Sequence, residues 1–225
     1  MSETEMSQPI YFFATGKTEG DATMKELLGG KGANLAEMTK IDIPVPPGFT
    51  ISTEQCKLYG ERGNQLPDGL WDEVERYLAR LEEVMGQKFG DTRDPLLVSV
   101  RSGAADSMPG MMDTILNLGL NDDSIRGLVD KAGTERFAWD AYRRLVNMFG
   151  NVVMGLDHAD FEAEMSGLKR EVGKAEDTDL TTADLQELTR RYMRVFEHRT
   201  GRAFPQDPHE QLRPAVEAVF RSSNN

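Results

Sequence analysis

The clearest alternation of apolar and polar positions runs from residue 96 to residue 101. One set of positions holds Leu96, Val98 and Val100, and the set between them holds Leu97, Ser99 and Arg101. Alternation with a period of two predicts a strand that buries the first set and turns Arg101 to the other face. Turn-forming residues follow at 102–110, and apolar residues resume at Ile115. We therefore predict two strands, joined by a flexible polar loop, over residues 96–119.

Before this stretch, the pattern predicts a mixture of strands and helices. Residues 10–14 form a short apolar run typical of a strand, and residues 44–51 form a rigid extended segment that leads into a second strand. Ser52 and Gln55 then form a capping box for a helix. Pro67 precedes another helix, which is expected to end at Gly86 and to bury the stripe Trp71, Val74, Leu78, Leu81 and Met85.

After residue 120, the apolar positions change to helical spacing. They predict five helices, around residues 125–129, 137–149, 161–168, 185–196 and 212–220. Gly150 is expected to close the second of these helices. Pro214 restricts where the last one can begin, because proline is tolerated mainly in a first helical turn.

The bulk properties exclude several classes of protein. The chain has 225 residues, enough for one large domain or two small ones, and its 26 Lys and Arg against 38 Asp and Glu give a net charge of −12. An acidic surface argues against nucleic acid and anionic membranes as partners, because both favour clustered Lys and Arg. No apolar run reaches the ~18 residues that a membrane span needs, and the N-terminus is acidic and polar. We therefore expect a soluble, cytoplasmic protein.

Two cations stand in stretches suited to phosphate. Residues 28–35 combine three glycines with Lys31 and lead into helical spacing, so we interpret them as a loop that opens a helix. Amides at a helix start attract phosphate, and Lys31 adds a full charge there. Arg101 is suited to a polyphosphate because its guanidinium makes bidentate, permanently charged contacts. The alternatives are a glycine turn with a purely geometric role and an ordinary hairpin with a surface arginine.

Other candidate motifs have simpler explanations. Gly16-Lys17-Thr18 copies the end of a P-loop, but Tyr11 stands where the first glycine is required, so we interpret this stretch as a turn. Cys56 is the only cysteine, which excludes an internal disulfide and favours a packing thiol over a nucleophile. The histidines are scattered among acidic or polar residues and are interpreted as exposed or structural; they are His158, His198 and His209.

Three stretches of the sequence resemble those of a known family. Residues 99–105 read Ser-Val-Arg-Ser-Gly-Ala-Ala, and residues 107–119 read Ser-Met-Pro-Gly-Met-Met-Asp-Thr-Ile-Leu-Asn-Leu-Gly. Residues 29–38 read Gly-Gly-Lys-Gly-Ala-Asn-Leu-Ala-Glu-Met. The sequence resembles the N-terminal ATP-binding domain of the pyruvate, phosphate dikinase family, from about Tyr11 to the C-terminus.

The resemblance implies which residues bind the nucleotide. It implies that Lys31 contacts the phosphates of ATP, with Arg101 and the loop amides around Gly110 beside it. Residues 142–144, Tyr-Arg-Arg, match a family motif in which one arginine contacts phosphate, and this is expected to be Arg144. The pattern alone does not choose between Arg143 and Arg144, and it also fits two solvated arginines beside an apolar stripe.

The resemblance also implies an α+β fold, namely the first lobe of an ATP-grasp nucleotide-binding domain with an inserted helical subdomain. The expected parts are a mobile tail (1–9), the first-lobe α/β subdomain (10–120), the helical subdomain (121–200) and the start of a return segment toward a second lobe (201–225). In the family, the ligands of Mg²⁺, most of the adenine pocket and the catalytic histidine lie in later regions. We therefore expect no catalytic or metal-ligating residue here, and we expect a fragment or a truncated gene product.

The implied function is the ATP-gripping part of an enzyme that converts ATP, phosphate and pyruvate to AMP, pyrophosphate and phosphoenolpyruvate. Its expected partners are ATP, with Mg²⁺, the second lobe and the histidine domain. One alternative is a truncated, non-catalytic binding or regulatory module, and another is that the helices after Asn121 associate with another chain. Asp106 and Ser223 depart from the family pattern, and the charge of Asp106 opposes triphosphate binding.

Overall fold

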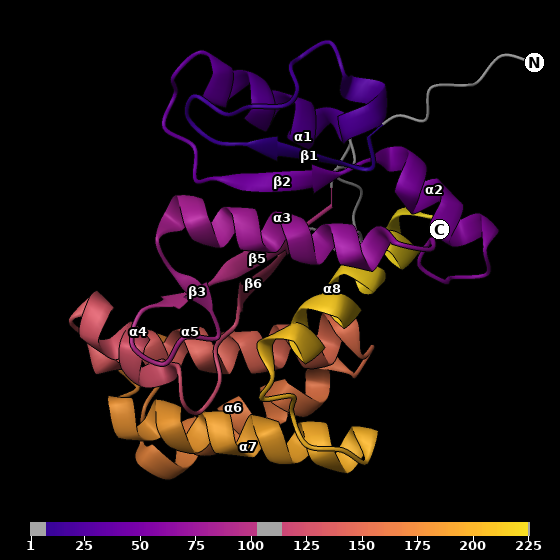
Figure 1. Ribbon diagram of the computed structural model, residues 1–225. Helices are drawn as coiled ribbons and strands as arrows, with labels where there is room; N and C mark the ends of the chain where they lie inside the picture. Colours follow the sequence, from indigo (N-terminus) through magenta and orange to yellow (C-terminus); the bar gives the residue numbers. More distant parts are fainter. Residues whose placement is uncertain (1–7, 103–113, 225) are drawn as a thin grey trace, which may run out of the picture. The chain divides into compact units, whose positions relative to one another are not determined.

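The computed structural model describes residues 8–102 and 114–224, which form helices and short strands, as the α+β prediction requires (Figure 1). Packing divides the chain into two compact units. Unit 1 comprises residues 1–86, 101–113 and 219–225, and unit 2 comprises residues 87–100 and 114–218. This division does not follow the ranges 10–120, 121–200 and 201–225, which stay a prediction.

Unit 1 is built on one antiparallel strand pair. β1 (Ile10–Phe13) pairs with β2 (Gly48–Ile51), and Ile10 lies opposite Ile51. α1 (Lys25–Lys40) packs on this pair from one side and α3 (Leu70–Met85) from the other (Figure 1). Both predicted strands are confirmed, and so is the turn at Gly16, where the Lys17 N–H donates to the Ala14 carbonyl at 2.9 Å.

The glycine-rich stretch in α1 differs from the prediction of a loop before a helix. Residues 25–28 are already helical, and the helix is interrupted at Gly29, whose φ of 69° and ψ of 169° are not helical. Only glycine adopts this positive φ without strain. Gly32 serves a second purpose, since a Cβ there would lie 2.8 Å from Cγ2 of Thr50. The glycines therefore kink α1 and allow it to approach β2 closely.

Two details of the next helices correct the sequence pattern. α2 (Thr53–Glu61) begins after Ser52 as expected, but the Ser52 side chain makes no capping hydrogen bond, so the predicted capping box is wrong. Ser52 is fully buried, and its backbone carbonyl accepts from the Gln55 N–H instead. α3 ends at Gly86 as predicted, but Met85 is exposed and Trp71 is half-buried. The buried stripe is Leu70, Val74, Tyr77, Leu78 and Leu81.

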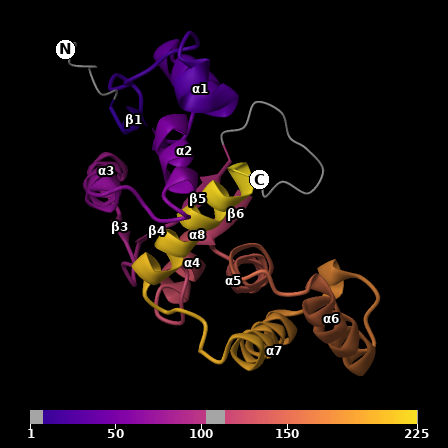
Figure 2. The ribbon, with the colours of Figure 1, turned by 90° about the vertical axis from the view of Figure 1, so that its right-hand side faces the viewer.

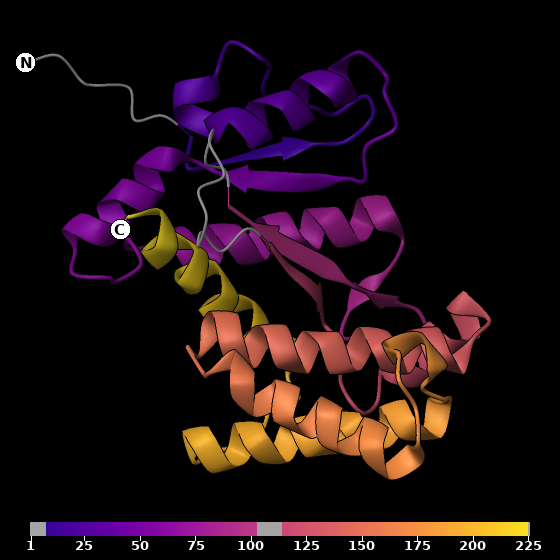
Figure 3. The same ribbon diagram turned by 180° about the vertical axis from the view of Figure 1, so that it is seen from behind.

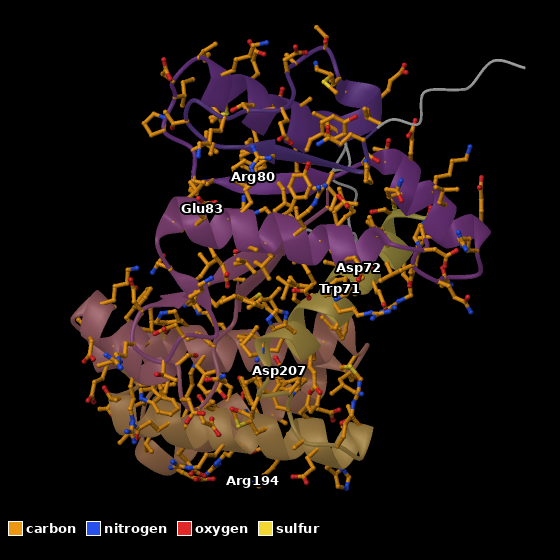
Figure 4. All side chains as sticks on the ribbon, viewed as in Figure 1. Trp71, Asp72, Arg80, Glu83, Arg194 and Asp207 are labelled. Carbon is orange, nitrogen blue, oxygen red and sulfur yellow. The ribbon has the colours of Figure 1, made fainter. Side chains whose placement is uncertain are left out.

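Glu19 ties the strand pair of unit 1 to α3. Its carboxylate accepts hydrogen bonds from the Phe12 N–H at 2.9 Å, the Tyr77 hydroxyl at 3.2 Å and the Gln8 amide at 3.1 Å, and it pairs with Arg80. Arg80 points from α3 toward the strands and lies 4.1 Å from the centre of the Phe12 ring (Figure 4). Desolvation alone would raise the pKa of Glu19, but the hydrogen bonds from Arg80 and Phe12 lower it below its usual value.

Glu19→Gln is therefore expected to destabilise unit 1 in a pH-dependent way. Because the pKa of Glu19 is lower in the folded chain than its usual 4.5, its carboxylate stabilises the fold above that pH. This stability is lost as the pH falls through the lower, folded pKa. Urea unfolding should show the variant less stable by about 1 kcal/mol at pH 7, a moderate value because both partners are partly exposed.

The matched control is Glu83→Gln, at an exposed position of α3 (Figure 4). Tryptophan fluorescence follows unit 1 through Trp71 when the other tryptophan, Trp139, is replaced by phenylalanine. The difference between Glu19→Gln and the parent should shrink as the pH falls below 4.5. A difference that is constant from pH 7 to pH 3 would contradict this account.

Unit 2 begins with short strands. β3 (Lys88–Phe89) pairs in parallel with β4 (Pro95–Leu96), and β5 (Val98–Arg101) pairs with β6 (Thr114–Leu118). The last residue of β5, Arg101, is the first of the segment counted in unit 1. The predicted single strand over 96–101 is therefore divided at Leu97, because its two parts pair with different strands. The alternation itself is confirmed, since Val98 and Val100 are half-buried while Ser99 and Arg101 are exposed.

All five helices predicted after residue 120 are present. They are α4 (Ile125–Ala132), α5 (Glu135–Met148), α6 (His158–Val172), α7 (Thr182–Thr200) and α8 (Pro208–Ser223). α7 packs against both α5 and α6 (Figure 3), and Figure 2 looks nearly along α5 and α7. α8 begins at Pro208 and runs through Pro214, which therefore lies inside the helix.

Gly150 does not close the second of these helices. The chain continues from α5 into a π-helical turn, η1 (Phe149–Val153), before the helical run ends. A Cβ on Gly150 would lie 2.5 Å from Cζ of Phe161. The glycine is therefore needed for close packing of this turn against α6, not for helix termination.

Aromatic rings and one buried hydroxyl hold the core of unit 2. The ring centroid of Phe204 lies 5.5 Å from that of Phe149 and 5.6 Å from that of Phe196. Tyr142 donates its hydroxyl hydrogen to Asp122 at 2.8 Å and accepts from Gln206 at 3.2 Å. Burial raises the pKa of Tyr142, so the hydroxyl stays protonated and able to donate. These contacts join the segment after α7 to the turn before α4.

Candidate functional site

Lys31 lies on the exposed side of α1, two residues after the break at Gly29. The other side of this helix is fixed in the core of unit 1 by Leu28, Ala33 and Ala36. The kink at Gly29 starts a new helical segment, and amides at such a start attract anions. The structure therefore places Lys31 beside the start of a helical segment, as the sequence suggested, although the segment follows a kink and not a loop.

Arg101 is the last residue of β5, and its side chain is exposed while Ser102 is buried. The strand mounts the guanidinium on regular backbone, as the alternation predicted. The loop that follows, residues 103–113, lies outside the described residues. The predicted contribution of Gly110 and the predicted opposition by Asp106 fall in that loop, so both stay predictions.

The predicted cations belong to different units. Lys31 and Arg101 are both in unit 1, whereas Arg144 is in unit 2. Because Lys31 and Arg101 belong to the same unit, both could contact the phosphates of one nucleotide. That they do so stays a prediction. One cavity among the described residues of unit 1, of about 280 Å³, is lined by Glu19, Arg76, Tyr77 and Arg80 and includes neither of these cations.

The two adjacent arginines of α5 have different environments. The side chain of Arg143 is only 8% exposed, while that of Arg144 is 59% exposed. Burial raises the pKa of Tyr192 on α7 to about 12, and the charge of the neighbouring Arg143 opposes this rise. Arg144, unlike Arg143, is thus accessible to a ligand, and this supports the choice that the sequence pattern alone left open.

Asp140 pairs with both arginines and was not identified from the sequence. Its carboxylate is 16% exposed and lies three and four positions before the two arginines. Residues at these spacings lie side by side on a helix. The signal in the sequence is an acidic residue three or four positions before a candidate arginine, and a search for this spacing would have identified Asp140.

The surroundings of the remaining candidate residues favour a structural role. Cys56 is partly buried, and burial raises the pKa of its thiol, the direction opposite to that of an activated nucleophile. His158 lies 3.3 Å from Glu162, and the His209 ring packs edge-on against Phe89 at 5.4 Å. Within residues 8–102 and 114–224, no group of three or more His, Cys, Asp and Glu side chains is placed to hold a metal ion. No helix in these same ranges is long and apolar enough to cross a membrane.

Comparison with known proteins gives one consistent family. Residues 25–68 and 62–225 match the family model described as "Pyruvate phosphate dikinase, AMP/ATP-binding domain". The chain is 57% identical over 216 residues to "Pyruvate, phosphate dikinase 2" of Zea mays, a match that covers 96% of this chain and 24% of that protein. It is 55% identical over 213 residues to "Pyruvate, phosphate dikinase, chloroplastic" of Mesembryanthemum crystallinum, covering 95% of this chain and 22% of that protein. The chain thus spans about a quarter of the length of the curated relatives that it matches.

Proposed function

Because the chain belongs to the family of pyruvate phosphate dikinase AMP/ATP-binding domains, we propose that it grips the phosphates of ATP as the N-terminal nucleotide-binding part of such an enzyme. The complete reaction converts ATP, phosphate and pyruvate to AMP, pyrophosphate and phosphoenolpyruvate. The phosphoryl group passes through a histidine on another domain. The match over residues 25–225 is the observation that supports this proposal most directly.

The chemistry of phosphoryl transfer indicates what the candidate residues do. Phosphoryl transfer depends mainly on positioning and on neutralising charge, so cations on rigid elements are the expected tools. In a chain with a net charge of −12, a phosphate site needs locally concentrated positive charge. Lys31 on α1, Arg101 at the end of β5 and Arg144 on α5 are exposed cations that supply it, and the amides around Gly110 complete the grip.

The same proposal covers the finer architecture. Unit 1 carries the β1–β2 strand pair and α1, on which Lys31 lies. The helices α4 to α7 supply the inserted helical subdomain of an ATP-grasp lobe. Mg²⁺ enters with the phosphates of ATP, and its protein ligands are proposed to lie in the second lobe. The second lobe and the histidine domain are the proposed partners. The compartment is proposed to be cytoplasmic, although several relatives carry the word chloroplastic in their names.

A chimera tests the proposal. This chain replaces the region that it matches over 216 residues in the Zea mays relative, and phosphoenolpyruvate formation is measured with ATP, phosphate and pyruvate. We expect activity within about tenfold of the parent enzyme, because the grafted part keeps its phosphate-binding residues. A folded chimera that transfers no phosphoryl group from ATP, beside an active parent, would refute the proposed function.

The chain by itself is expected to bind ATP weakly. Its proposed contacts reach only the phosphates, whereas the adenine pocket and the magnesium ligands are proposed to lie in the partner lobe. Calorimetry with Mg²⁺ and ATP should therefore give a dissociation constant above about 100 μM, or no measurable heat. Submicromolar affinity would show that this chain already forms a complete site without the partner lobe.

A further inference from the structure

One carboxylate of α5 is shared by two arginines, and each of its oxygens serves a different one. Arg143 donates from Nε and from Nη2 to Oδ1 of Asp140, at 2.9 and 2.6 Å. Arg144 places Nη2 2.8 Å from Oδ2 of the same carboxylate. The three side chains therefore form a chain of contacts from the interior of unit 2 to its surface.

The inner part of this series of contacts, formed by Asp140 and Arg143, is rigid. Asp140 is 16% exposed and Arg143 is 8% exposed, and two N–H groups on a single oxygen restrict how the carboxylate can turn. Arg136, one turn earlier on α5, does not compete for Asp140, because it donates to the carbonyls of Leu180 at 2.8 Å and Asp177 at 2.9 Å. Oδ2 of Asp140 is thus held at a defined place beside Arg144.

The outer part of this series of contacts, the ion pair between Asp140 and Arg144, contributes little to the stability of the fold. Arg144 is 59% exposed, and ion pairs at such positions contribute little to stability because water screens them. An exposed arginine without a partner, however, samples many rotamers, and ordering it on a ligand costs entropy. A fixed carboxylate that limits those rotamers reduces this cost. The group of three keeps one net positive charge, so it still attracts phosphate.

We propose that Asp140 is a positioning residue that holds the Arg144 guanidinium in place for the phosphates of ATP, with Arg143 as the anchor of its carboxylate. This inference rests on the proposed function, in which Arg144 contacts ATP. It assigns a role to a residue that makes no contact with the nucleotide itself. It also explains why a partly buried carboxylate and a buried arginine lie directly beside an exposed arginine.

The test is a double-mutant cycle in the chimera, with the KM for ATP and kcat measured separately. In Asp140→Asn, the amide oxygen still accepts from Arg143, but the NH₂ group now faces Arg144 and offers it no acceptor. We expect the KM for ATP to rise about fivefold with kcat changed less than about twofold, because binding and not chemistry is affected. In an Arg144→Ala background, the same substitution should change KM by less than about 1.5-fold, because the two residues act as one unit.

Two further variants keep the test decisive. Asp130→Asn, at an exposed position of α4, makes the same chemical change and should leave KM unaltered. Asp140→Glu retains the charge that Arg143 needs, so it folds even if Asp140→Asn does not. It moves the carboxylate by one methylene, so it should raise KM about threefold, again only when Arg144 is present.

The outcomes separate the two proposals. An equal rise of KM in both backgrounds would make Asp140 merely structural and would overturn this inference. An unchanged KM in both Asp140 variants, beside a raised KM in Arg144→Ala, would overturn it while leaving the proposed function intact. If Arg144→Ala itself leaves KM unchanged, the proposed contact of Arg144 with ATP fails, and the role of Asp140 fails with it.

Discussion

Lys31→Ala in the chimera is expected to slow phosphoryl transfer from ATP to the histidine domain by about a hundredfold, the usual loss when one preorganised charge or donor is removed from a transferring group. The Lys31 side chain is exposed, and the core side of α1 is formed by other residues, so the fold should be little affected. Transfer is followed with labelled ATP in a single turnover. Arg101→Ala should have an effect of the same order, because it removes an equal charge from the proposed phosphate site.

The control for this experiment is Lys25→Ala. Lys25 is an exposed lysine on the helical segment before the break at Gly29, so the substitution removes the same charge from the same helix. Its transfer rate should stay within about twofold of the parent, as expected for a charge without a specific contact. Circular dichroism of each variant establishes that the fold is intact. A folded Lys31→Ala chimera with an unchanged transfer rate would remove Lys31 from the mechanism.

Much of the fold follows from the spacing of apolar residues. The strand at 10–13, the alternation at 98–101 and all five helices after residue 120 are where the pattern predicts them, because each element buries one face in a core. Two of the errors lie at glycines. Gly29 interrupts a helix and Gly150 packs against Phe161, although the sequence favoured a loop and a helix end. Glycine serves as a breaker, a kink or a close contact, and only its neighbours in space decide which.

The candidate site was predictable to a smaller extent. A sequence gives residue types in order, so it could suggest Arg101 from strand alternation but could not separate Arg143 from Arg144. That choice depends on which arginine faces α7, and therefore on the packing of two distant segments. Asp140 was detectable from its spacing, but its importance depends on the burial of Arg143, which is again a tertiary property.

Gln211→Ala is expected to cause the largest loss of stability in unit 2, about 3 kcal/mol in the free energy of unfolding, because it leaves several buried groups without partners. Gln211 is fully buried on α8. Its Oε1 accepts from the Gly119 N–H at 2.9 Å, and its Nε2 donates to the carbonyls of Leu120 and Pro205, each at 2.9 Å. One side chain thus satisfies three backbone groups from two segments far apart in the sequence.

Gln211→Met separates hydrogen bonding from packing, because methionine has nearly the same length and fills the same space. It should still cost about 2 kcal/mol, since all three backbone groups lose their partner and those of Gly119 and Leu120 stay buried. Urea unfolding is followed through Trp139 of α5 in a Trp71→Phe background. Glu210→Ala, at the exposed neighbouring position, should cost less than about 1 kcal/mol, the limit for a charge in a first helical turn. If Gln211→Met were as stable as the parent, the side chain would act by filling space, and its hydrogen bonds would not hold the two segments together.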